Sequence, residues 1–210
     1  MPLPAADLIR PRLTADLARV NAASHLGPLR LSDVLCSTGD RGFALVLLLV
    51  TFPFVLPFPT LGLATPVGFA LALAALGLVA GRPAVLPRSL GTLAISPVIL
   101  ARASAVVSRG AWVLGGIARA RMPFMMSGSM RIALGISLFT AAVILGLPIP
   151  LPLSNFFPAV AIILLAVGVL EGDGLLVVAG HAATVAVCAI VAGSCTAVVT
   201  VATGLAGRFL

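Results

Sequence analysis

Three long stretches of this sequence contain no charged residue, and they constrain the fold more than any other feature. The stretches run from Phe43 to Gly81, from Ile132 to Leu170 and from Gly174 to Gly207. Over the whole chain 60% of residues are hydrophobic and only 9% are charged, whereas soluble domains have roughly a quarter charged. So little polar surface predicts an all-α integral membrane protein, because lipid forces backbone groups to bond within helices.

Closely spaced prolines interrupt the first two apolar stretches. Pro57 and Pro59 divide the first stretch, and Pro148 and Pro150 divide the second. The arms of the first stretch, about 14 and 17 residues, would measure about 21 and 25 Å as helices. The hydrocarbon core of a bilayer is about 30 Å thick. Two interpretations stay open: re-entrant hairpins that enter the membrane and return, or hairpins that cross it through kinked helices.

The second apolar stretch repeats the first. Each contains a Leu-Pro-x-Pro turn and ends in Gly-x-x-x-Gly, where small residues permit close helix packing in lipid. The aligned residues share one offset: Leu56 with Leu147, Pro57 with Pro148, Pro59 with Pro150, Ala70 with Ala161, Leu73 with Leu164, Ala75 with Ala166, Gly77 with Gly168 and Gly81 with Gly172. We therefore predict two repeated, proline-kinked helical hairpins.

Charge and hydropathy divide the chain into five regions. All 13 basic residues are Arg, the net charge is +7, and the turns carry no Arg. The positive-inside rule therefore predicts a cytoplasmic N-terminus in the bacterial inner membrane. The predicted regions are a cytoplasmic amphipathic region (1–42), membrane repeat 1 (43–81), a basic amphipathic linker (82–130), membrane repeat 2 (131–173) and C-terminal transmembrane segments (174–210), with a break near Gly193 to Cys195.

The linker admits two interpretations. Arg102 and Arg109 share a helical face, which predicts one or two helices lying in the membrane surface. The alternative is an imperfect transmembrane helix over residues 92–118, at the cost of burying arginines. Surface helices make the two repeats parallel copies, whereas a crossing linker makes them inverted copies, as in many transporters.

The two turns are the candidate substrate site. Short, proline-interrupted segments at matching places in two repeats point to a transport site, and buried helix N-termini attract anions. The residues of this hypothesis are Pro57, Pro59, Thr65, Pro148, Pro150, Ser154 and Asn155. Helix capping is the simpler explanation of Ser154 and Asn155, and Thr65 followed by proline also predicts a cap.

A second hypothesis concerns ionisable residues late in the chain. Glu171 and Asp173 are the only acids after residue 40, and His181 follows in an apolar run. They form either a site for a cation or proton, or structural features: an ion pair, a turn and a packed neutral histidine.

The sequence contains no pattern typical of an enzyme, a cofactor site or a metal site, and we expect none of the three. Cys36, Cys188 and Cys195 lack ligand spacing and predict free thiols. The expected partners are anionic lipid headgroups, a second copy of the chain in a homo-oligomer such as a dimer, and envelope polysaccharide machinery, but not nucleic acid.

Two segments carry a resemblance to a known family. "GDRGFALVLLL" before the first turn and "NFFPAVAIILLAVGVLEGDGLLV" after the second resemble the ExoD family of bacterial membrane proteins. This resemblance implies a small inner-membrane protein linked to exopolysaccharide synthesis, and it supplies no catalytic residues. We expect a transporter-like protein; the alternative is a scaffold subunit of an exopolysaccharide machine that transports nothing.

Overall fold

The structure is a computed structural model that describes residues 12–24, 30–38, 40–56, 62–80, 129–148 and 154–209, with positions 92, 94, 98, 100–102 and 105. Apart from one isolated bridge between Arg30 and Ala94, these residues form only helices and turns, which confirms the all-α prediction. The elements are α1 (Arg12–Ser24), α2 (Leu31–Thr38), α3 (Asp40–Thr51), the 3₁₀ helix η2 (Phe52–Val55), α4 (Ala64–Val79), α7 (Ser129–Gly146), α8 (Phe156–Glu171) and α9 (Gly174–Phe209).

The first arm of repeat 1 tightens before it reaches its turn. Pro53 lies in η2, and the amide of Leu56 donates to the carbonyl of Pro53 at 3.2 Å. Proline removes an amide donor and crowds the preceding turn, so the α-helix changes to the tighter 3₁₀ form. The helical part of this arm also begins at Asp40 rather than at the predicted boundary, Phe43.

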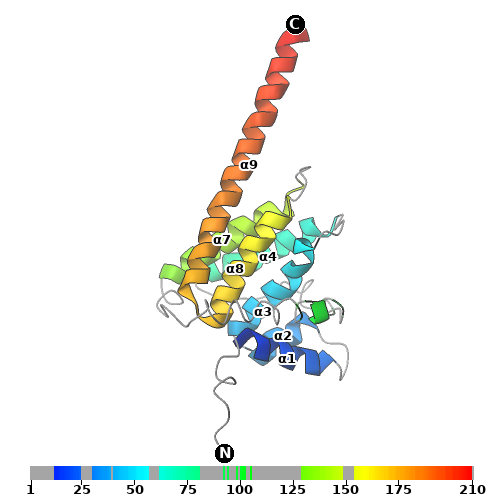
Figure 1. The fold of residues 1–210 in the computed structure, drawn as a ribbon, viewed down its shortest axis with the longest axis vertical. Helices are drawn as coiled ribbons and strands as arrows, with labels where there is room; N and C mark the ends of the chain where they lie inside the picture. Colours follow the sequence, from blue (N-terminus) through cyan, green and yellow to red (C-terminus); the bar gives the residue numbers. More distant parts are fainter. Residues whose placement is uncertain are drawn as a thin grey trace, which may run out of the picture.

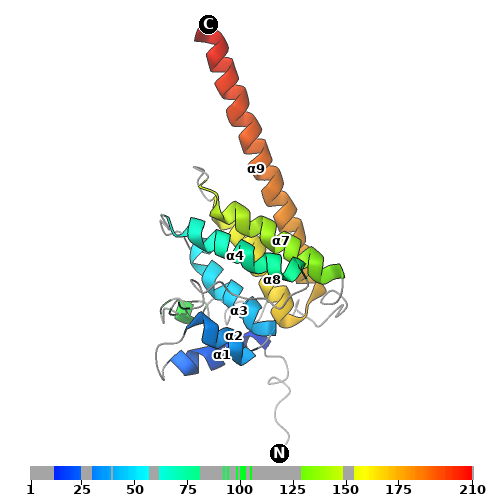
Figure 2. The same cartoon turned by 180° about the vertical axis from the view of Figure 1, so that it is seen from behind.

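The helices of the first apolar stretch pack mainly on helices of the second stretch. α4 makes its main contact with α7, and α3 makes its main contact with α8 (Figures 1 and 2). Each arm of the first stretch therefore lies on the opposite arm of the second stretch. Within the first stretch, α3 and α4 make no comparable contact with each other, so the predicted repeated hairpins stay a prediction.

Glycines set the closest approaches between these helices. A methyl group placed on Gly68 of α4 would overlap the backbone of Gly146 and lie 2.7 Å from the carbonyl oxygen of Ala142. Near the other end of the same crossing, a methyl group on Gly135 would lie 2.9 Å from the side chain of Val79. α4 and α7 are therefore antiparallel along their length. Of the predicted packing glycines, Gly172 instead ends α8 in the left-handed conformation, with φ 70°.

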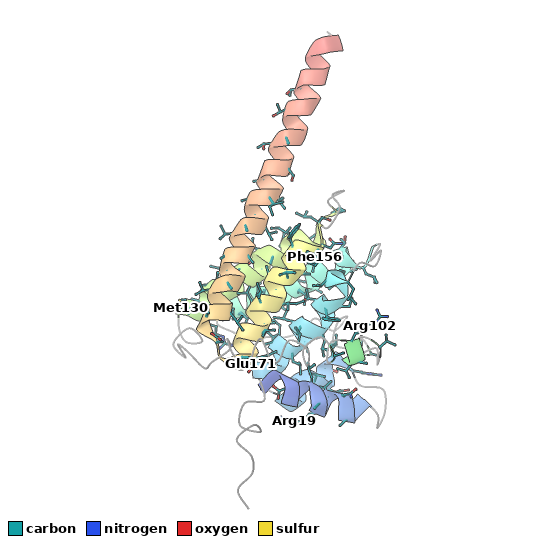
Figure 3. The ribbon with its side chains drawn as sticks, in the orientation of Figure 1. Arg19, Arg102, Met130, Phe156 and Glu171 are labelled. Atoms are coloured by element: carbon teal, nitrogen blue, oxygen red, sulfur yellow. The ribbon has the colours of Figure 1, made fainter. Side chains whose placement is uncertain are left out.

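The bundle has two chemically different ends. At the turn end, defined here by Leu56, Gly62–Thr65, Gly146–Pro148 and Ser154–Phe157, the sequence carries no charge. The charged end contains Arg131, Glu171 and Asp173, and α1 and α2 lie beside it. In Figure 3, Phe156 and Glu171 mark the two ends of α8, with α1 near Glu171.

Helix α9 is the longest element and leaves the bundle. It packs on α8 at its start and then extends past the turn end (Figure 1). The predicted break near Gly193 to Cys195 is wrong, because α9 continues without interruption to Phe209. The hydroxyl of Ser194 donates to the carbonyl of Ile190 at 2.8 Å, so this polar group is satisfied within the helix.

The core is hydrocarbon, and much of the outer surface is hydrocarbon too. Leu45, Leu145 and Leu165 are fully buried between the helices. One helix in the described part of the chain is long and apolar enough to cross a membrane: residues 174–197, with mean hydropathy 2.3. Large apolar side chains also face outward, among them Leu63, Phe69, Leu73, Leu76, Ile132, Ile136, Val185 and Ile190.

Candidate functional site

The structure brings residues that flank the two turns to the same end of the bundle. A methyl group on Gly146, just before the second turn, would lie 3.4 Å from the carbonyl oxygen of Thr65, just after the first. Pro148 follows Gly146 closely and is exposed, while Ser154 and Asn155 are partly buried at the start of α8. The other predicted residues of this site, Pro57, Pro59 and Pro150, lie outside the described residues.

Two helices begin at the turn end without a side-chain cap. Leu63 occupies the N-cap position of α4, so the prediction that Thr65 caps this helix is wrong. Asn155 occupies the N-cap position of α8, as the sequence suggested, but its side chain makes no capping hydrogen bond. The first amides of a helix have no intrahelical partner.

Proline reduces the number of N-terminal amides that lack an intrahelical partner. Pro66 and Pro158 each occupy the third position of their helix, where proline has no amide to leave unpaired. Ala64 and Thr65 of α4, and Phe156 and Phe157 of α8, supply the amides ahead of the prolines. The turn end therefore presents positive helix termini with no basic side chain, an arrangement that attracts anions.

The two acidic residues lie at the charged end, where Asp173 makes hydrogen bonds at the junction of α8 and α9. Asp173 is buried, and its Oδ1 atom accepts a hydrogen bond from the amide of Leu175 at 2.9 Å, which caps α9. Its own amide donates to the carbonyl of Gly168 at 2.9 Å and closes the end of α8. Glu171 is also buried nearby. The turn and cap interpretation is thus supported by hydrogen bonds for Asp173.

His181 does not join those acids. It lies about 12 Å from Asp173 along the axis of α9, given a rise of 1.5 Å per residue. Its Nδ1 atom shares a 2.6 Å hydrogen bond with Oγ of Ser137 on α7. Its Nε2 atom is buried without a partner in the part of the chain that the structure describes. The three residues of the ion-site hypothesis therefore fall into two separate places.

Nothing in the sequence predicted that Ser137 and His181 would form a hydrogen bond. Serine is common in helices, and the two residues come from different apolar stretches. The only available signal was that both are polar residues in apolar runs, where polar side chains bond across helices. Cys188 and Cys195 are free thiols, as predicted; the side chain of Cys36 lies outside the described residues.

A cavity between four helices is the second feature that sequence reasoning missed. Its volume is about 100 Å³, and Arg131 is the one charged residue among the described residues that line it. The guanidinium of Arg131 has no hydrogen bond or ion pair with any described residue. The lining residues are Phe43, Ala44, Leu47, Leu78, Arg131, Leu134, Leu138, Leu165, Ala166 and Val169.

Comparisons with known proteins identify a matching family and two similar proteins. A family described as "Exopolysaccharide synthesis, ExoD" matches residues 13–193. Protein ExoD of Rhizobium meliloti is 31% identical over 176 residues, covering 80% of this chain and 71% of that protein. An uncharacterized protein of Synechocystis is 32% identical over 175 residues, covering 80% of each chain. No solved structure matches this chain.

Proposed function

Because this chain belongs to the ExoD family of exopolysaccharide-synthesis proteins, we propose that it is a transporter-like component of exopolysaccharide synthesis in the bacterial inner membrane. Its substrate contacts lie at the turn end, among Thr65, Pro148, Ser154 and Asn155. The proposed role is non-catalytic and uses no cofactor.

The membrane location is supported by the length and surface of the helices. Only residues 174–197 form an apolar helix long enough to cross, among the residues that the structure describes. α4 and α8, with 16 residues each, measure about 24 Å against a core of about 30 Å. We infer that α9 crosses the membrane and that the bundle penetrates it without crossing, as re-entrant hairpins do.

The orientation follows from the charges. The N-terminal region and Arg131 lie at the charged end, which the positive-inside rule assigns to the cytoplasm. The turn end then lies within the opposite leaflet. Anionic lipid headgroups surround the charged end on the cytoplasmic side, where arginines attract them.

One observation carries the transport proposal: two helices start, uncapped, at one uncharged end of an apolar bundle. In lipid an unsatisfied amide costs several kcal/mol, so these termini require water, protein or a ligand as a partner. An anionic group on an exopolysaccharide precursor would supply that partner. The tip of a re-entrant segment is also where transporters place substrate sites.

A scaffold role is the second candidate, and the contact of Gly68 with Gly146 favours it. The backbones of α4 and α7 touch there, so this crossing contains no space for a substrate. In that case the turn end is sealed, and the outer face of α9 binds other subunits or a second copy of this chain. The exposed Val185 and Ile190 on α9 support such an oligomer contact.

Cysteine labelling distinguishes the two candidates. The three native cysteines are replaced, and single cysteines are introduced as Thr65→Cys and Asn155→Cys. Leu73→Cys serves as the control, because Leu73 is 63% exposed on the apolar outer face of α4. A membrane-impermeant maleimide is applied to right-side-out and to inverted vesicles, and exopolysaccharide output is measured in labelled cells.

The transport proposal expects both turn-end cysteines to react through a water path, from one side only, while the control does not react. Modification at Asn155→Cys then lowers exopolysaccharide output at least tenfold. If neither turn-end cysteine reacts from either side, the turn end is dry and the scaffold role replaces the transport role.

A further inference from the structure

We propose that the cavity at Arg131 binds a lipid phosphate, with the phosphate on the guanidinium and part of a hydrocarbon chain between the four helices. This site lies at the charged end, away from the turn end, and it stands whether or not the turn end transports anything. Nothing in the family's description assigns it.

The shape of the cavity sets the size of the buried group. Leu47, Leu138 and Leu165 are among the residues that line it, each from a different helix. A volume of about 100 Å³ is of the order of apolar cavities that stay dry and accept small hydrocarbons. It holds a short length of one chain, while the rest of the lipid stays in the bilayer.

The chemistry of the lining determines what enters. Apart from Arg131, the lining side chains that the structure describes are all hydrocarbon, so the hydroxyl groups of a sugar would find no side-chain partners among them. A lipid fits, and a polysaccharide does not. The cavity therefore selects the lipid part of any lipid-linked molecule.

Arg131 determines the charge of the ligand. It is partly buried near the start of α7, where no described residue pairs with it. Glu171 is buried at the same end of the bundle. An uncompensated guanidinium at an apolar cavity attracts an anion, and its planar fork matches phosphate oxygens in pairs.

Binding by the full chain in an uncharged detergent tests this site, with native mass spectrometry as the readout. The probes are dioctanoyl phosphatidic acid, a polyprenyl phosphate, dioctanoylglycerol and inorganic phosphate. We expect either lipid phosphate to bind at least tenfold more tightly than dioctanoylglycerol or inorganic phosphate. The tighter of the two lipid phosphates identifies the source of the natural ligand, a phospholipid or a lipid carrier.

Variants separate the site from general attraction to arginine. Arg131→Gln should weaken lipid phosphate binding at least tenfold, while Arg102→Gln, which removes the same charge from an exposed position, should leave it unchanged. Ala166→Val narrows the cavity and should weaken binding at least fivefold without lowering the melting temperature. Ala44→Val is the second such variant if Ala166→Val lowers that temperature.

Three results would overturn the proposal. One is equal loss of binding in Arg131→Gln and Arg102→Gln. Another is unchanged binding in a stable cavity-narrowing variant, which would make Arg131 a surface anchor for headgroups only. The third is binding of inorganic phosphate as tight as that of a lipid phosphate.

Discussion

His181 links two helices that otherwise meet through hydrocarbon. Its bond with Ser137 joins α9 to α7, and the partner atom lies far away in the sequence. Such bonds between helices in lipid stabilise a fold by about 0.6 kcal/mol on average and by up to about 1.7 kcal/mol. The packed-histidine interpretation thus has a specific partner, whereas a proton relay would need a second partner for Nε2.

We predict that Ser137→Ala destabilises the bundle by about 1 kcal/mol, because it leaves Nδ1 of His181 without a partner. The measurement is the free energy of unfolding in mixed micelles. Thr140→Val is the matched control on the same helix, since the hydroxyl of Thr140 donates within its own helix to Ile136 at 2.9 Å. Equal losses in the two variants would show that the Ser137 bond contributes nothing specific.

At the scale of the elements, the crossing of α4 and α7 depends on how closely two backbones approach. The sequence indicated that small residues would matter, and it suggested Gly168 with Gly172. Gly168 does pack closely, with a methyl group there 2.8 Å from the amide of Val177 on α9. Gly172 instead provides a helix end that needs positive φ. Which glycine meets which helix depends on the pairing of helices.

We predict a graded series for glycine-to-alanine variants. Gly68→Ala forces backbones apart and should destabilise by about 2 to 3 kcal/mol. A methyl group on Gly146 would have its nearest contact at 3.3 Å, so Gly146→Ala should destabilise the bundle less. A methyl group on Gly193 would meet open space, so Gly193→Ala should be neutral or stabilising by up to about 1 kcal/mol. Unfolding free energies of the three variants check the order. A Gly193→Ala loss as large as that of Gly68→Ala would contradict the crossing.

The whole molecule joins a short bundle to a helix much longer than its neighbours. If the bundle penetrates without crossing, α9 is the single full crossing, and the two termini face opposite sides of the membrane. If each hairpin crosses fully, those crossings cancel in pairs, and the termini still face opposite sides. The depth of the turn end in the membrane therefore distinguishes the two interpretations. The side of the membrane on which the C-terminus lies tests whether α9 crosses.

We predict that a C-terminal alkaline phosphatase fusion is active in the periplasm, whereas an N-terminal fusion is inactive. The reason is that α9 starts at the charged end, which we propose to be cytoplasmic, and has enough apolar length to cross. A fusion truncated at Gly172, before α9, serves as the control and should be inactive. Activity of that truncated fusion would show that Gly172, at the charged end of the bundle, faces the periplasm, and would contradict the prediction.

Local sequence determined much of this protein. The lack of charge predicted a membrane protein, the apolar runs formed the predicted helices, and two of these helices end close to Val55 and Gly146, just before the prolines. These features depend on neighbouring residues along the chain, so they are visible in the sequence. Two local predictions were wrong: Leu63 rather than Thr65 occupies the N-cap position of α4, and α9 has no break near Gly193.

Only the tertiary structure decided which helices pair and what they enclose. The packing of α3 on α8 and of α4 on α7 brought Thr65 close to Gly146 and left a cavity beside Arg131. Leucine and alanine fill every arm, so composition makes many pairings equally apolar. The relative energies of these pairings depend on how closely two helix backbones fit against each other. This fit is a property of the packed helices and cannot be read from one helix alone.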